Sequence, residues 1–164
     1  MPRVNPEVES FARIKVIGVG GSGTNAVNHM VESKVQGVEF IVMNTDAQHL
    51  QQSPVSKKLH IGKNLTRGLG TGMDPDLGRR AAEESLEDIQ ALIKGADMVF
   101  ISCGMGGGTG TGAAPVVAKV AKDLGALTIG VVTKPFYFEA KQRKAIADKG
   151  AEELKKEVDA IISI

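Results

Sequence analysis

The chain has 164 residues, with 20 Lys and Arg against 19 Asp and Glu, so its formal net charge is +1. This is the length of one domain, and a charge near zero gives no general attraction to nucleic acid or to an anionic membrane. A single cysteine excludes an internal disulfide, and the apolar runs are far shorter than the ~20 residues of a membrane helix. These features predict a globular protein of the reducing cytoplasm.

The first part of the chain alternates apolar runs with polar or amphipathic segments. Residues 1–10 carry two prolines and mixed charge, and we expect them to form a flexible leader. The apolar, β-branched run at 13–21 ends in glycines and predicts a strand buried on both faces, followed by a helix over 22–33. A second buried strand is predicted over 38–46. The segment 47–72 is polar and rich in glycine, and its LHIG sequence is compatible with a short strand.

A helix with clear ends is predicted in the middle of the chain. Asp74 is suited to cap its amino terminus and Pro75 to occupy its first position, whereas Gly95 is a natural stop. Between these ends, apolar residues recur at the spacing of one helix face. They are Ala82, Leu86, Ile89 and Ile93.

The last part of the chain continues the alternation. A glycine-rich loop at 106–112 follows a long apolar run, and Gly150 is expected to interrupt the last helix. The predicted elements here are a strand at 96–105, a helix at 113–125, a strand at 126–136, a helix at 139–158 and a strand at 160–164.

The alternation of strands and helices over residues 11–164 predicts one α/β domain. We expect a Rossmann-like, doubly wound, mostly parallel sheet with helices on both faces. Right-handed crossovers in such folds place ligands at the carboxyl ends of the strands. The glycine clusters lie where predicted strands end or helices begin, and therefore at that edge.

The first glycine cluster follows a predicted strand and precedes a helix. Gly18, Gly20 and Gly23 satisfy G-x-G-x-x-G, a pattern typical of dinucleotide-binding turns. Asp46 ends the next strand, where a Rossmann fold places an acid on the ribose. The motif therefore leaves two interpretations open: an NAD-dependent oxidoreductase, or a tight turn that binds no ligand.

The second cluster, residues 106–112, favours a ligand with a longer phosphate chain. Backbone N–H groups of such a loop at a helix amino terminus form a cradle for phosphate, and Thr109 and Thr111 add hydroxyl donors. A dinucleotide fold has no need of this second cradle; the structural alternative is a flexible hinge. Neither loop carries the lysine of a Walker motif, so the main chain must hold the phosphates. Gly108 is expected to need a positive φ.

A third stretch, Gly68 to Gly72, precedes the predicted helix start at Asp74. It could close over a terminal phosphate, and it is equally compatible with an ordinary capped loop. The three histidines have no second ligand at a metal spacing, and no catalytic set with geometric support can be named. From the residues alone we therefore expect neither a metal site nor a catalytic residue.

The glycine-rich run GGGTGTG at 106–112 resembles the signature loop of the tubulin/FtsZ superfamily of GTPases. KVIGVGGSGTNAVNHM, VMNTDAQHL, LTRGLGTGMDP and FEAKQR resemble, in order and spacing, the FtsZ family of prokaryotic cell-division proteins. The resemblance extends over essentially the whole chain beyond residue 10. It implies a GTP- and GDP-binding domain with Mg²⁺ bound through the phosphates. It also implies head-to-tail filaments at midcell in the cytoplasm and contacts with other cell-division proteins, without nucleic acid or membrane insertion.

The resemblance also implies roles for individual residues. Residues 20–25 would wrap the diphosphate, 106–111 would hold the β- and γ-phosphates, and 70–72 would sense the γ-phosphate. Asn44 and Asp46 would lie near the phosphates and Mg²⁺. Glu139 would accept a hydrogen bond from the ribose, Arg143 would lie near the ribose or base, and Pro135 would shape the preceding loop. The implied nucleotide-binding residues are Gly20, Gly21, Ser22, Gly23, Thr24, Asn25, Asn44, Asp46, Gly70, Thr71, Gly72, Gly106, Gly107, Gly108, Thr109, Gly110, Thr111, Pro135, Glu139 and Arg143.

The sequence departs from the family pattern at several places. Ser22 and Thr24 stand where Gly and Asn are commoner, and Asp74 would repel a γ-phosphate unless it points away as a helix cap. Compared with the family, the chain stops before the central helix, the catalytic loop and the second domain. We therefore expect weak binding of GTP or GDP, little hydrolysis, and an uncovered apolar face through which the chain could dimerise. A nucleotide-free, self-associating fragment is a further alternative.

Overall fold

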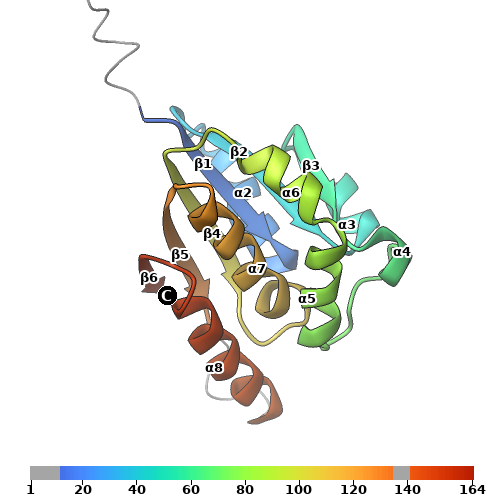
Figure 1. Ribbon diagram of the computed structural model, residues 1–164. Coiled ribbons are helices and arrows are strands. Elements are labelled where there is room, and N and C mark those ends of the chain that lie inside the picture. Colours follow the sequence, from blue (N-terminus) through green and yellow to red (C-terminus); the bar gives the residue numbers. More distant parts are fainter. Residues whose placement is uncertain (1–11, 135–140) are drawn as a thin grey trace, which may run out of the picture.

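The computed structural model describes residues 12–134 and 141–164. Six strands form one sheet in the order β3-β2-β1-β4-β5-β6 (Figure 1). All neighbouring pairs are parallel, so the predicted doubly wound α/β fold is confirmed, with the strand order of a Rossmann sheet. The strands are β1 (Ile14–Val19), β2 (Glu39–Asn44), β3 (Lys57–His60), β4 (Met98–Gly104), β5 (Leu127–Thr133) and β6 (Ala160–Ser163).

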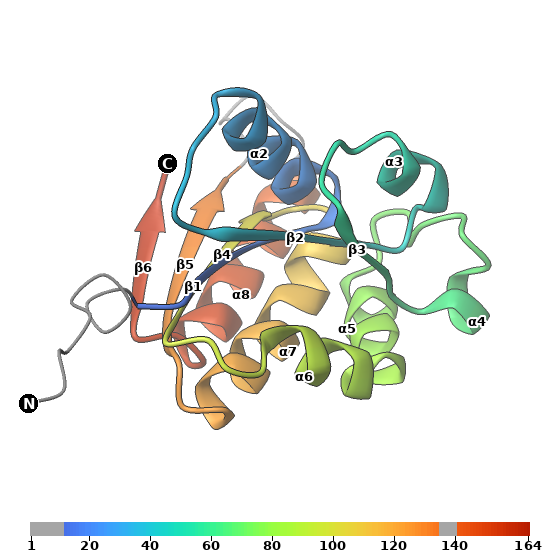
Figure 2. The ribbon, with the colours of Figure 1, turned by 90° about the horizontal axis from the view of Figure 1, so that it is seen from above.

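Helices cover both faces of this sheet, as predicted. One face carries α2, which packs on β1, β2 and β4, whereas α5, α6, α7 and α8 lie on the opposite face (Figure 2). The helices are α2 (Gly20–Glu32), α3 (Ala47–Gln51), α4 (Lys63–Thr66), α5 (Pro75–Glu84), α6 (Leu86–Ile93), α7 (Thr109–Asp123) and α8 (Lys141–Lys155).

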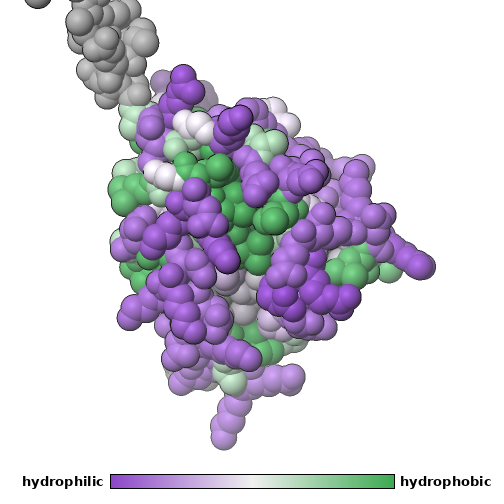
Figure 3. Space-filling model, in the orientation of Figure 1, coloured by the Kyte–Doolittle hydropathy of each residue, from purple (hydrophilic) through white to green (hydrophobic). Residues whose placement is uncertain are grey.

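The core lies in two layers, one on each side of the sheet. Successive side chains of a strand point to opposite faces, so Val16 joins the smaller layer under α2, while Ile17 and Val19 join the larger layer under α5 to α8. Full burial of each such side chain contributes about 1.5–3 kcal/mol to the stability of the folded state. Polar side chains predominate on the outer face of the molecule formed by α5 to α8. Apolar side chains gather on this face near α6 and α7 (Figure 3).

The segment 47–72 is more regular than its composition predicts. It contains α3, β3 and α4. The short strand starts two residues before the LHIG sequence, at Lys57. Downstream, the single helix predicted from Asp74 to Gly95 is divided into α5 and α6 at Ser85, whose hydroxyl accepts a hydrogen bond from the N–H of Gly62 at 3.1 Å. The break therefore coincides with a contact to a distant loop.

Two helices begin inside glycine-rich stretches where no helix was predicted. Helix α2 begins at Gly20 and α7 at Thr109, two and four residues earlier than predicted. Glycines therefore make up half or more of the first four residues of both helices. This brings backbone N–H groups, rather than side chains, to the edge where the strands end.

Gly150 does not interrupt α8, contrary to the prediction. A Cβ at this position would lie 2.3 Å from the Thr111 Cγ2 atom and 3.0 Å from the Met105 Sδ atom. The missing side chain lets α8 approach the start of α7 closely. The cost of a glycine inside a helix, about 1 kcal/mol, is thus offset by helix packing.

Several predictions fall on residues that the structure does not describe. They are the leader at 1–10, the end of the strand predicted to reach 136, the first two residues of the helix predicted from 139, Pro135 and Glu139. Within the described part of the chain, no helix combines the length and apolar character needed to span a bilayer.

Candidate functional site

The carboxyl ends of β1, β2 and β4 surround a pocket of about 890 Å³. All three glycine stretches contribute to its walls, together with the end of β5 and the start of α8. The predicted site residues that line it are Gly21, Ser22, Asn44, Asp46, Gly70, Thr71, Gly72, Gly107, Gly108, Thr109, Gly110 and Arg143.

The other predicted residues that the structure describes lie beside the pocket and support its walls. A Cβ at Gly23 would lie 2.1 Å from the Ser102 carbonyl oxygen, so this glycine lets α2 pack on β4. Thr24 is fully buried in α2. The hydroxyl of Thr111 accepts a hydrogen bond from the N–H of Gly106 at 2.9 Å and so holds the second loop closed. Asn25 is exposed on α2.

The first glycine cluster contacts the second, residues 106–112, through Gly20. Gly20 has a φ of +77°, and a Cβ built on it would lie 2.9 Å from the amide nitrogen of Gly110. Only glycine combines this backbone conformation with this close approach. The amino termini of α2 and α7 therefore meet at one place.

Both of these helix termini lack a side-chain cap. The N-cap residue is Val19 in α2 and Gly108 in α7, and neither makes a side-chain cap hydrogen bond. By contrast, Asp46 caps α3 and Asp74 caps α5. The first N–H groups of a helix have no intrahelical acceptor and carry its positive dipole end. The two uncapped termini at the pocket are thus suited to an anion.

The expected conformation of Gly108 is wrong. Its φ is −85°, in the right-handed helical region, and the left-handed glycine of this loop is Gly106, with a φ of 109°. What Gly108 requires is space, because a Cβ there would lie 2.1 Å from the Thr71 hydroxyl oxygen. The glycine is needed because the third loop packs against it.

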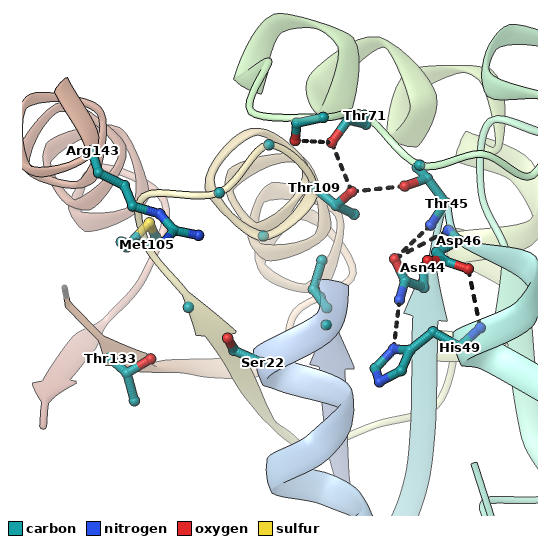
Figure 4. Close-up of a pocket in the computed structure, with 18 of the residues that line it drawn as sticks. Ser22, Asn44, Thr45, Asp46, His49, Thr71, Met105, Thr109, Thr133 and Arg143 are labelled. Atoms are coloured by element: carbon teal, nitrogen blue, oxygen red, sulfur yellow. Dashed lines mark hydrogen bonds between the residues drawn. The ribbon is translucent and has the colours of Figure 1, made fainter. Parts of the chain in front are cut away.

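Three buried threonines join three separate loops at the floor of the pocket. The Thr109 hydroxyl lies 2.7 Å from that of Thr45 and 3.1 Å from that of Thr71 (Figure 4). The sequence analysis did not identify Thr45. Its position directly after β2, beside two predicted site residues, is the signal that could have found it.

Asp74 does not line the pocket. Its carboxylate accepts hydrogen bonds from the N–H groups of Asp76 at 3.0 Å and Leu77 at 3.3 Å. The residue therefore caps α5, as predicted, and its charge is directed to that helix rather than to the pocket.

The end of β2 is held by hydrogen bonds within its own loop. Asn44 accepts from the backbone N–H groups of Thr45 at 2.8 Å and Asp46 at 3.3 Å. Asp46 accepts from the N–H of His49 at 3.0 Å and caps α3. The sequence analysis assigned no role to His49, whose ring lies in this wall of the pocket (Figure 4).

The opposite end of the pocket is basic. Lys134 follows β5, and Arg143 extends from α8 into the pocket (Figure 4). Asp46 is the one residue with a carboxylate side chain among the described residues that line it. In the described part of the chain, no group of three or more His, Cys, Asp or Glu could hold a metal ion.

Comparison with known proteins assigns this fold to a family. A model described as the GTPase domain of the Tubulin/FtsZ family matches residues 13–164. A cell division protein FtsZ from Buchnera aphidicola subsp. Schizaphis graminum (strain Sg) is 56% identical over 158 residues, which are 96% of this chain and 41% of that protein. The chain thus spans about two fifths of the length of that relative.

Solved structures agree with this assignment. An empty FtsZ dimer from M. jannaschii has a TM-score of 0.92 and 46% identity, over 98% of this chain and 49% of that one. A GTPγS-bound protofilament of CetZ2 from Haloferax volcanii has a TM-score of 0.85 and 25% identity, over 93% and 48% of the two chains. Because the family model matches nearly the whole chain and the fold agrees, the chain belongs to the tubulin/FtsZ family, whose GTPase domain it matches.

Proposed function

We propose that this chain is the guanine-nucleotide-binding part of an FtsZ-like cytoskeletal GTPase that polymerises for cell division. The observation that carries the proposal is the meeting of two uncapped helix amino termini, α2 and α7, at one pocket. Family membership and the nucleotide in the CetZ2 structure support the choice of a guanine nucleotide.

In this proposal the phosphates are bound by main chain. Gly21 and Ser22 in the first turn of α2 face the diphosphate, and residues 106–111 hold the β- and γ-phosphates. The third loop, with Thr71 and Gly72, lies beside the γ-phosphate. Helix dipoles and threonine hydroxyls supply the positive potential that a Walker lysine supplies in other nucleotide enzymes.

The other site assignments are part of the same proposal. Glu139 accepts a hydrogen bond from the ribose, Arg143 lies near the ribose or base, and Pro135 shapes the loop before them. Mg²⁺ would be held mainly by phosphate oxygens, with Asp46 nearby, because the Asp46 carboxylate also caps α3. When bound, the ion would neutralise charge on the phosphates.

Activity and partners belong to the whole protein in the relatives, of which this chain covers 41% and 49%. We infer head-to-tail filaments, supported by the CetZ2 protofilament, and contacts with other division proteins at midcell in the cytoplasm. Phosphoryl transfer depends on a completely positioned site. The 164-residue chain alone should therefore bind nucleotide weakly and hydrolyse little.

The test is calorimetric titration of the chain with GDP, GTP, ATP and NAD. The proposal predicts binding of GDP and GTP in preference to ATP, with no heat from NAD. Binding of NAD without guanine nucleotides would instead support the oxidoreductase alternative. That alternative relied on Asp46, whose carboxylate caps α3.

A further inference from the structure

The imidazole of His49 connects two walls of the pocket. Its Nδ1 atom lies 3.1 Å from the Asn44 Nδ2 atom at the end of β2, and its Nε2 atom lies 3.1 Å from the Asn25 Oδ1 atom on α2. A Cβ on Gly21 would lie 3.9 Å from the His49 Cε1 atom, so the ring edge also borders the first glycine loop. One side chain therefore contacts two predicted nucleotide-binding residues and lies beside a third.

The hydrogen bonds of Asn44 determine which nitrogen of the ring carries the proton. The Asn44 side-chain oxygen accepts from the N–H groups of Thr45 and Asp46, which orients the amide with its NH₂ group toward His49. An amide nitrogen can only donate. The Nδ1 atom of His49 must therefore accept, which leaves the proton of a neutral ring on Nε2, where it donates to Asn25.

We propose that His49 is a positioning residue of the nucleotide pocket, and that it acts as the neutral Nε2–H tautomer. It fixes the Asn44 amide and ties the first turns of α2 to the end of β2. This inference rests on the proposed function, because its effect is on the geometry of the phosphate-binding wall.

The surroundings of His49 are built for such a role. Its backbone N–H donates a hydrogen bond to the Asp46 carboxylate at the amino terminus of α3, so the backbone that carries the ring is held in place. Asn44 is only 3% exposed, and losing its partner would leave a nearly buried NH₂ group unsatisfied. Residues that orient a binding group need such supporting contacts to hold its geometry.

Substitutions can separate the hydrogen bonds from the space that the ring fills. A glutamine amide has an acceptor and a donor attached to one carbon, like the two ring nitrogens attached to Cε1, so His49→Gln can retain the bridge. His49→Leu fills similar space without donor or acceptor. His29→Leu is the matched control, because His29 is exposed near the end of α2, away from the pocket.

The first experiment is ¹⁵N NMR of the imidazole nitrogens in the 164-residue chain without nucleotide, at a pH where the ring is neutral. We expect a protonated Nε2 and an unprotonated Nδ1. His49→Gln removes one set of histidine signals and so assigns them. A ring protonated on Nδ1, or rapid exchange between tautomers, would overturn the bridge whether or not the chain binds nucleotide.

The second experiment compares GDP affinity among the variants by calorimetry. We expect His49→Leu to weaken binding about 3- to 10-fold, the loss of one or two hydrogen bonds, and His49→Gln and His29→Leu to stay within about twofold of wild type. Equal affinities of His49→Leu and wild type, or equal losses in the Leu and Gln variants, would overturn the positioning role. If wild type binds no guanine nucleotide, the proposed function fails, and the positioning role fails with it, while the tautomer result still stands on its own.

Discussion

At the residue scale, the glycines of the second loop serve different purposes. Gly106 supplies a left-handed backbone, Gly108 makes room for Thr71, and Gly110 lies against the first loop. A Cβ on Gly107, by contrast, would meet no atom of the described residues within 4 Å, although the residue lines the pocket. A substitution at Gly107 therefore probes contact with the ligand rather than packing within the protein.

Gly107→Val should weaken binding of GDP by about tenfold or more, because the added methyl groups occupy space assigned to phosphate. Its thermal unfolding should match that of wild type. The control is Ala160→Val, which adds a similar volume at an exposed position of β6. Calorimetry on both variants makes the comparison, and wild-type affinity in Gly107→Val would show that this loop does not contact the nucleotide.

Cys103 shows how burial determines reactivity. The thiol is 2% exposed in β4, and burial raises its pKa from 9.0 to about 12. Since the thiolate is the nucleophile, native protein at pH 8 should not react with an alkylating reagent, whereas unfolded protein should react rapidly. Mass spectrometry with and without denaturant checks this, and fast labelling of native protein would contradict it.

The same pKa has a consequence for stability. The unfolded thiol ionises near pH 9 while the folded thiol stays protonated. The folded state therefore binds more protons between pH 9 and 12, so this residue makes the free energy of unfolding fall as pH rises through that range. Well below pH 9 both states bind this proton, and the residue contributes no pH dependence.

At the element scale, two glycines let α5 and α7 approach closely near their amino termini. A Cβ on Gly112 of α7 would lie 1.9 Å from the Pro75 carbonyl oxygen, and one on Gly78 of α5 would lie 2.3 Å from the Gly108 carbonyl oxygen. This contact places the third loop beside the second. The Thr71 and Thr109 hydroxyls then come within 3.1 Å of each other.

Gly112→Ala should lower the free energy of unfolding by about 1–3 kcal/mol, because backbone on both helices must shift. Gly107→Ala should change it by less than about 0.5 kcal/mol, since no atom of the described residues lies within 4 Å of its Cβ. Urea denaturation gives both values. Equal effects of the two substitutions would argue against the close helix contact.

At the scale of the whole molecule, the sheet is covered unevenly. Helix α2 packs on β1, β2 and β4. On the same face, Leu127 of β5 and Ile162 of β6 are 46% and 50% exposed. Register places Ile162 beside Val131, so these apolar side chains lie on one continuous surface. Apolar surface of this kind favours association of copies.

We expect the chain to associate reversibly at high concentration through this face, with or without nucleotide. Ile162→Lys should weaken the association, because a buried lysine at the contact would have to be desolvated. Val35→Lys is the control, since Val35 is 46% exposed elsewhere. Sedimentation velocity over a concentration series measures the association of wild type and both variants. A monomer throughout, or equal effects of the two substitutions, would contradict the assignment of this face.

Local sequence was sufficient where the physical cause is local. The cap at Asp74 with Pro75 beside it, and the buried β-branched strands, were predicted correctly because capping and strand burial are properties of a few neighbouring residues. The starts of α2 and α7 were placed too late, because glycine disfavours a helix unless tertiary contacts fix it. Thr45 and His49 were missed for another reason. Each has a partner that is distant in the chain: Thr109 lies 64 residues from Thr45, and Asn25 lies 24 residues from His49.

The sequence by itself determined the α/β class, the alternation of strands and helices, and the edge at which the glycine clusters gather. Hydrophobic periodicity and the positions of glycines are properties of the local sequence. Only the tertiary structure decided how these clusters are used. It alone showed that α2 and α7 meet without side-chain caps, that three threonines join the loops, and that His49 connects two walls. These features depend on distances between segments far apart in sequence, and those distances are set by packing on the sheet.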